Sequence, residues 1–234
     1  MSKQKSLPTP TEEQFNALNN AYQYFNQVLF DGLLPGCILN FSRKKNTHGF
    51  LAPERWRKVG ESEYSTHEIS LTPTTLYREP VEVFSTLVHE QVHLWQWDFG
   101  NPSRSGYHNR EWANKMIEVG LMPSDTGKEG GKQTGQRMTH YIIPDGAYEK
   151  AFKKMPEKYT LPFTSLEGDI MKALTTGKTL PSPKPSSKPA VTKSRSKTKY
   201  SCPSCKVNVW GKPNLNIVCG ICNVNFEPSN QAPH

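Results

Sequence analysis

Apolar residues near the N-terminus recur at the spacing of one helix face. Thr11, with Gln14 three residues later, forms a capping box at the start of this pattern. Asp31-Gly32 supplies a stop and a turn at its end. The sequence therefore predicts an amphipathic helix that begins at Thr11 and packs one face into the core. The positions on that face are Phe15, Leu18, Tyr22, Phe25 and Leu29.

Three short apolar runs follow and predict a small β-sheet. They are residues 37–41 (CILNF), a run that starts at His48, and residues 67–71 (HEISL), with polar turns between them. Residues 55–58 (RWRK) are predicted to continue from the second strand as a basic loop. We expect HEISL to be the edge strand, where an extended peptide backbone could pair with it.

Two helices are predicted after the sheet. The first starts at Pro80, which suits an opening helical turn, and ends at residues 100–102 (GNP). The second runs over residues 110–119, with Asn109 as its cap and Gly120 as its stop. Apolar side chains on one face of each helix are expected to be buried.

Residues 124–176 are predicted to alternate between loop and regular structure. Residues 124–137 contain four glycines and predict a surface loop, with a lid or a DNA contact as the alternatives. Residues 138–143 predict a strand, and residues 146–176 predict one or two short helices. Together, residues 11–176 are expected to form one α+β domain.

Composition limits the classes of protein that this chain can be. Among 234 residues only 35% are hydrophobic, and no apolar run reaches the length of a membrane span. The first residues lack the apolar core of a secretory signal. Four of the five cysteines lie in closely spaced pairs, which suits metal binding better than disulfides. We expect a cytoplasmic or nucleoid-associated protein without membrane contact.

The positive charge of the chain is concentrated in its tail. The net charge is +8, but residues 177–199 carry seven basic side chains and no acid, and residues 200–234 carry a net +1, which leaves residues 1–176 neutral. The low-complexity residues 177–199 are predicted to form a disordered linker that either binds DNA or serves only as a soluble spacer. Its basic residues are Lys178, Lys184, Lys188, Lys193, Arg195, Lys197 and Lys199.

The predicted helix after Pro80 contains the sequence H-E-x-x-H. His89 and His93 are four residues apart, so both project from one helix face and can bind one Zn²⁺. Glu90 lies about a quarter-turn away, where it can take a proton from a zinc-bound water rather than bind the metal. The pattern predicts a catalytic zinc site.

A third ligand must come from farther along the chain, and the residues leave two candidates. His108 lies 15 residues past His93, at the start of the next predicted helix. Glu111 lies 18 residues past His93, as in thermolysin-type sites. His48 and His67 are better interpreted as strand-end histidines than as ligands.

The cysteine pairs predict a second metal site. Cys202 and Cys205 are followed after thirteen residues by Cys219 and Cys222. This C-x2-C…C-x2-C spacing is typical of a structural zinc ribbon, here residues 200–228, whose small core needs the metal to fold. Within it, Trp210 and Lys212 could contact nucleic acid, or Trp210 could pack against the cysteines.

Six segments in order resemble the SprT-like, Spartan-type metallopeptidases. The resemblance implies a zincin-like fold, zinc ligands His89, His93 and His108, and Glu90 as catalytic base. It also implies a protease that degrades proteins crosslinked to or trapped on DNA. The segments are FNQVLFDGLLP (25–35), HGFLAPERW (48–56), HEISLTP (67–73), TLVHEQVHLWQ (86–96), GYHNREW (106–112) and IEVGLMP (117–123).

The sequence interpretation is a zinc endopeptidase that acts at DNA, single-stranded DNA included. It requires one catalytic and one structural Zn²⁺. His140 or Tyr141, in the predicted strand 138–143, could donate a hydrogen bond to the oxyanion of the reaction. The alternatives are a regulatory peptidase that cleaves a repressor-like protein and a non-catalytic DNA-binding scaffold. Glu90 argues against the scaffold, because a structural zinc site needs no base.

Overall fold

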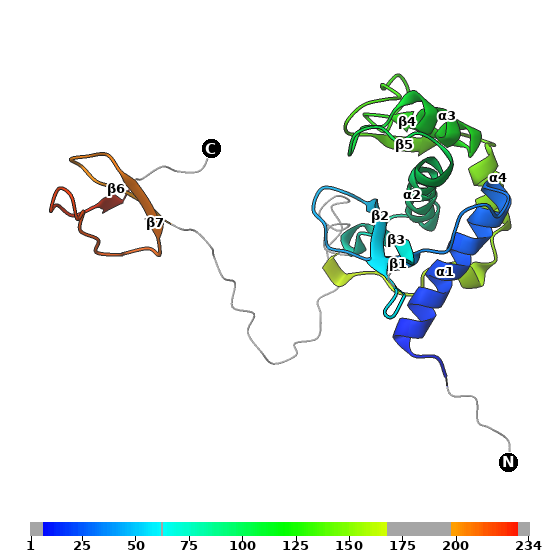
Figure 1. Ribbon diagram of the computed structural model, residues 1–234, viewed down its shortest axis with the longest axis horizontal. Coiled ribbons are helices and arrows are strands. Elements are labelled where there is room, and N and C mark those ends of the chain that lie inside the picture. The colour runs from blue at the N-terminus through cyan, green and yellow to red at the C-terminus, as the bar shows by residue number, and fades with distance from the viewer. Residues whose placement is uncertain (1–6, 62, 168–197, 229–234) are drawn as a thin grey trace, which may run out of the picture. The chain divides into compact units, whose positions relative to one another are not determined.

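The computed structural model describes residues 7–61, 63–167 and 198–228 (Figure 1). The chain divides into two compact units, Met1–Pro181 and Ser182–His234. Among the described residues, the first unit has four α-helices and two small sheets, and the second has one three-stranded sheet. This mixed architecture confirms the α+β class predicted from the sequence.

The N-terminal helix α1 begins slightly earlier than predicted, at Pro10–Leu29. Its capping box is formed by Thr9 and Glu12, not by Thr11 and Gln14. The Thr9 side chain accepts from the backbone N–H of Glu12, and the Glu12 carboxylate accepts from the backbone N–H of Thr9 at 2.7 Å. A proline is well placed directly after such a cap, because it has no N–H to satisfy.

The main sheet consists of β1 (Ile38–Phe41), β2 (Gly49–Arg57) and β3 (Ser65–Leu71). Its order is β1-β3-β2, with β1 parallel and β2 antiparallel to β3. The prediction that HEISL forms the edge is therefore wrong. The last four residues of β3 are buried, as expected for a central strand.

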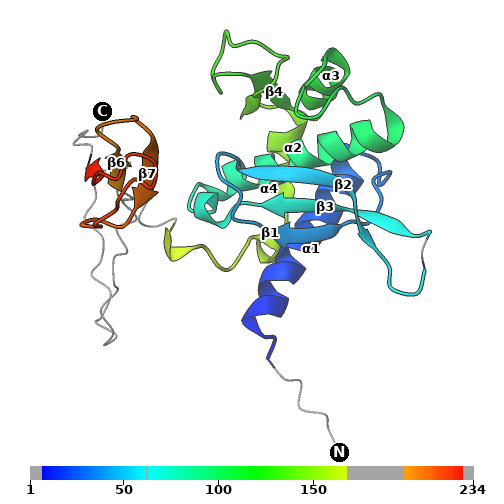
Figure 2. The same cartoon turned by 60° about the vertical axis from the view of Figure 1, so that its left-hand side comes forward.

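The edge strand beside the long helix α2 (Pro80–Phe99) is β2 instead (Figure 2). It extends through residues 55–57, which were predicted to lie in a loop. The pairing with β3 shifts between Ala52 and Trp56, where Glu54 has a φ of 49°. This bulge separates the stretch that pairs near α2 from the basic end of the strand.

The helices of the first unit pack around one hydrophobic core. After the 3-10 turn η1 (Pro73–Thr75), α2 runs through the middle of the unit and buries twelve of its residues. Helix α3 (Arg110–Glu118) is capped by Asn109, as predicted, and α4 (Ala147–Lys154) is followed by η2 (Glu157–Tyr159). The core includes Phe25, Phe84, Leu87, Val88, Trp112, Met116 and Tyr148.

A two-stranded sheet follows α3. It pairs β4 (Leu121–Ser124) with β5 (Thr139–Ile142) in antiparallel register, and Pro123 lies opposite His140. Hydrogen bonds hold the glycine-rich segment between the two strands. The Ser124 hydroxyl donates to the backbone carbonyl of Lys128, and the Asp125 carboxylate accepts from the backbone N–H of Lys132. This small sheet carries His140 toward α2.

The second unit is built from β6 (Thr198–Ser201), β7 (Asn208–Gly211) and β8 (Glu227–Pro228), in the order β7-β6-β8. Its first strand begins at Thr198, so Lys199 belongs to the sheet and not to the predicted linker. The other linker residues proposed to contact DNA, Lys184, Lys188, Lys193, Arg195 and Lys197, lie outside the described residues. Within the parts that the structure describes, no helix is both long and apolar enough to cross a membrane.

Candidate metal centres and catalytic site

Three histidines converge in the first unit. His89 and His93 come from α2, and His108 lies just before α3. One nitrogen from each ring can be chosen so that all three lie within 4.8 Å of one another, and the Nε2 atoms of His93 and His108 are 3.1 Å apart. This arrangement matches the three-histidine set that the family resemblance implies.

The alternative third ligand, Glu111, makes hydrogen bonds away from the three histidines. Its carboxylate accepts hydrogen bonds from the Gln96 side chain and from the backbone N–H of Asn101, both at 2.7 Å. These bonds lower the pKa of Glu111 and tie the start of α3 to the end of α2. Glu111 therefore supports the loop that leads to His108 and does not join the histidines.

The protonation states of the three histidines suit a metal ion. Burial lowers the pKa of His93 to about 3, and burial also lowers the pKa of His89 and of His108. Neutral imidazole is the form that binds metals, so these side chains need to lose no proton at neutral pH. Three imidazole nitrogens with further positions open are a common donor set of catalytic Zn²⁺.

Trp112 closes one side of the histidine group. This residue of α3 is fully buried, and its ring stacks on His93 at 5.2 Å and meets His108 edge-on at 4.4 Å. Its ring also lies 5.0 Å from that of His89. The apolar face of this helix predicts only that Trp112 is buried, but its ring contacts all three candidate ligands and limits how far each can rotate.

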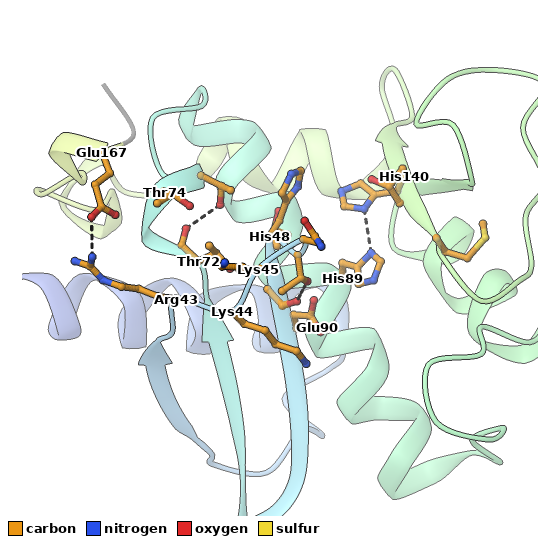
Figure 3. Close-up of a pocket in the computed structure, with 17 residues that line it drawn as sticks. Arg43, Lys44, Lys45, His48, Thr72, Thr74, His89, Glu90, His140 and Glu167 are labelled. Carbon is orange, nitrogen blue, oxygen red and sulfur yellow. Dashed lines mark hydrogen bonds and ion pairs between the residues drawn. The ribbon is translucent and has the colours of Figure 1, made fainter. Parts of the chain in front are cut away.

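Glu90 and His89 face a cleft of about 770 Å³ (Figure 3). Glu90 is 5% exposed and accepts a hydrogen bond from the backbone N–H of Leu51 in β2. Burial raises the pKa of Glu90 to about 8, an effect that the Leu51 hydrogen bond and the positive charge of Lys44 partly oppose. A carboxyl group poised near neutral pH can both accept and donate a proton.

Gly49, the first residue of β2, allows this strand to approach Glu90 closely. A Cβ at this position would lie 3.2 Å from Glu90 Oε1, 3.1 Å from Thr86 Cγ2 and 3.0 Å from the backbone oxygen of Ser70. Any side chain here would therefore move either the strand or the Glu90 carboxylate. The sequence contained no local signal for this role.

We expect Gly49→Ala to lower kcat by about 10–100-fold while zinc content stays at the wild-type value, because small displacements of a catalytic group are costly. The measurement is peptide hydrolysis together with metal analysis. Gly36→Ala is the matched control, since a Cβ there meets nothing within 4 Å. A Gly49→Ala chain with wild-type kcat would show that the close approach to Glu90 is unimportant.

Of the two proposed oxyanion donors, only His140 lines the cleft. Tyr141 is the next residue of β5, and successive side chains of a strand point to opposite faces. His140 Nδ1 lies 3.1 Å from His89 Nδ1, and its Nε2 lies 2.8 Å from the Ser85 hydroxyl. Burial lowers the pKa of His140 to about 3, which keeps the ring neutral at pH 7.

The glycine-rich segment, predicted to be a surface loop, contacts the third histidine. His108 and Gly135 exchange backbone hydrogen bonds of 2.8 and 3.1 Å, and the His108 ring Nδ1 lies 3.2 Å from the same carbonyl oxygen. When Nδ1 donates to that carbonyl, the Nε2 lone pair of His108 is free for a metal. The segment therefore orients a candidate ligand.

The two histidines set aside as ligands indeed stay outside the three-histidine group. His67 Nε2 lies 3.3 Å from the Asp98 carboxylate, and its Nδ1 accepts from the backbone N–H of Glu54. His48 lines the cleft at the start of β2 but does not join the group.

The second unit brings Cys202, Cys205, Cys219 and Cys222 within 4.8 Å of one another. The two pairs have matching local structure. The backbone N–H of Lys206 donates to the backbone carbonyl of Cys202, and that of Asn223 donates to the backbone carbonyl of Cys219. Lys206 and Asn223 both have positive φ. Four thiolates around one point form a closed tetrahedral donor set, which fits a structural zinc ion.

The small core of the second unit contains Tyr200 and not Trp210. Tyr200 is 2% exposed, and its hydroxyl donates to the Lys212 carbonyl and accepts from the backbone N–H of Leu215. Trp210 is 61% exposed, which rules out the alternative that it packs against the cysteines. It lies directly opposite Lys199 across the β6–β7 pair.

Comparison with known proteins identifies the class to which this fold and these sites belong. Residues 18–133 match the SprT-like family. A segment of 65 residues is 42% identical to an uncharacterised protein in the mucB 3′ region of Salmonella typhimurium, and it covers 27% of this chain and 82% of that protein. No solved structure matches the chain. The chain belongs to the SprT-like family, as its sequence segments predicted.

Proposed function

We propose that this protein is a zinc-dependent endopeptidase of zincin type that acts on proteins associated with DNA. The proposed catalytic activity rests on one observation, which is the arrangement of side chains on and beside α2. Three neutral histidines converge there, and Glu90 faces the same cleft as His89. Membership of the SprT-like family supports the same activity.

When bound by His89, His93 and His108, Zn²⁺ would polarise the scissile carbonyl and make the attacking water more acidic. The chain supplies the proton transfers. Glu90 accepts a proton from the attacking water and returns it to the leaving amine. Its burial and the Leu51 N–H hold the carboxylate in place for both steps.

The edge strand β2 is the natural place for a substrate backbone. It lies beside α2 on the outside of the sheet, and its first residue, Gly49, lines the cleft. An extended peptide added to this edge would run past Glu90 and the histidines. Recognition through the backbone would let the enzyme cut many sequences.

DNA association is proposed from the tail and the second unit. Trp210 is exposed opposite Lys199, and Lys212 follows at the end of β7. An exposed indole ring beside basic side chains suits stacking on the bases of single-stranded DNA. The neutral residues 1–176 would reach DNA-bound substrates through this tether, which raises their effective concentration.

We expect residues 177–234 to supply most of the DNA affinity. Binding to single-stranded DNA loses affinity with salt at a slope of about −0.7 per neutralised phosphate, so four to seven contacts give about −3 to −5. Deleting 177–234 should flatten this slope and leave hydrolysis of a short peptide nearly unchanged. The measurements are binding isotherms at several salt concentrations and a cleavage assay of a DNA-bound protein with and without single-stranded DNA.

A full-length variant with the six cations of residues 177–197 changed to glutamine, and with Lys199 of β6 kept, separates the linker from the zinc ribbon. It should retain the Trp210 contribution but lose most of the salt slope. If chain 1–176 binds DNA with wild-type affinity and slope, the DNA surface lies on the first unit. Arg55, Arg57 and Lys58 near the end of β2, together with residues 124–137, would then be the first to test.

A further inference from the structure

His140 joins two parts of α2 through its two ring nitrogens. Its Nδ1 lies 3.1 Å from Nδ1 of His89, and its Nε2 lies 2.8 Å from the hydroxyl of Ser85, one turn earlier on the same helix. Figure 3 shows the rings of His89 and His140 close to each other, joined by a dashed line. His140 comes from β5, 51 residues after His89.

The positions of the protons in these hydrogen bonds can be assigned by starting from the Ser85 hydroxyl. The Ser85 hydroxyl donates its single proton to the Glu82 carbonyl at 2.9 Å, so its oxygen accepts from His140. His140 then carries its proton on Nε2, and its Nδ1 is an acceptor. His89 must donate from Nδ1, which leaves the lone pair of His89 Nε2 free for a metal.

These assignments also leave His140 without a spare donor. A neutral imidazole has one N–H, and here it is used on Ser85. A hydrogen bond to the oxyanion of a reacting peptide would require breaking that contact. The position of His140 in the cleft is thus better explained by its bond to His89 than by a contact with substrate.

We propose that His140 is a positioning residue that fixes the tautomer and ring orientation of His89, with Ser85 fixing His140 in turn. His108 is oriented in the same way by the backbone carbonyl of Gly135. Metal-binding histidines commonly donate their second ring N–H to such a partner, and loss of the partner weakens metal binding by about 10–100-fold. The inference rests on the proposed zinc site.

The test is a competition between full-length protein and chelators of graded strength, with the zinc in the cysteine site as an internal reference. We expect His140→Ala to bind the histidine-site zinc about 10–100-fold more weakly than wild type. His140→Asn should restore most of that affinity, because its amide oxygen can accept from His89 Nδ1. Tyr141→Phe, a change in the neighbouring residue of β5, is the matched control and should bind zinc like wild type.

Three results would overturn the role of His140. They are an unchanged zinc affinity in His140→Ala, an equal loss in His140→Asn and His140→Ala, and a lower kcat at unchanged zinc affinity. The last would place His140 on the reacting carbonyl. A wild-type chain that holds only the cysteine-site zinc would instead refute the proposed function itself, so the two failures are distinguishable.

Discussion

Replacement of Glu90 by glutamine is expected to lower peptide hydrolysis by about 10²–10⁴-fold, the usual contribution of a general acid–base group. Glutamine has nearly the same shape, and it can still accept the backbone hydrogen bond of Leu51. It cannot take a proton from the attacking water. Zinc content and thermal stability should therefore stay close to wild type while activity is lost.

Glu111→Gln is the matched control for this experiment. It makes the same chemical change in a carboxylate that bonds to Gln96 and Asn101, outside the cleft. We expect this variant to keep wild-type kcat. If Glu90→Gln hydrolyses peptides at the wild-type rate, Glu90 is not the catalytic base.

The second large effect concerns the third ligand. His108→Ala should weaken the histidine zinc site by more than the roughly 100-fold that loss of an orienting partner can cost. The reason is that it removes one of only three donor atoms. Metal analysis after mild chelation should find two zinc ions per wild-type chain and one per His108→Ala chain.

Glu111→Ala tests the competing assignment under the same conditions. Because Glu111 only supports the loop before α3, this variant should retain two zinc ions. The reverse pattern, with zinc lost from Glu111→Ala and kept by His108→Ala, would favour a glutamate ligand and contradict the geometry around α2.

Local patterns predicted the helices well, since their signals lie within a few residues. The apolar period of α1 and the Asn109 cap of α3 needed no long-range information. The order of the sheet did depend on such information. The alternation in HEISL fits a strand, but only pairing with β1 on one side and β2 on the other decides that it is central.

The candidate site likewise contains residues that local sequence predicts and residues that only long-range contacts bring in. The spacing of His89, Glu90 and His93 is a property of one helix, so the sequence alone indicated it. His108 was selected over Glu111 by the family resemblance, and the structure explains the choice by the contacts that occupy Glu111.

Other contributions to the site come from distant parts of the chain. The sequence did not single out Gly49 or Trp112, and it offered His140 only as a candidate oxyanion donor. Gly49 belongs to a strand, Trp112 to the next helix and His140 to the second sheet, and all three meet α2 only in the folded protein. The exposed position of Trp210 was likewise undecidable, because Tyr200 and Trp210 have similar apolar character. Only the packing of the hairpin shows that Tyr200 fills the small core.

The most direct measurement of the central claim is zinc add-back to the full-length protein. Chelation strong enough to empty the histidine site, but not the four-cysteine site, should abolish hydrolysis of a short peptide. Stepwise return of Zn²⁺ should then restore activity in proportion to the second zinc bound, reaching the wild-type rate at two per chain. Full activity with only one zinc bound, held by the cysteines, would contradict the assignment of His89, His93 and His108 as a catalytic zinc site.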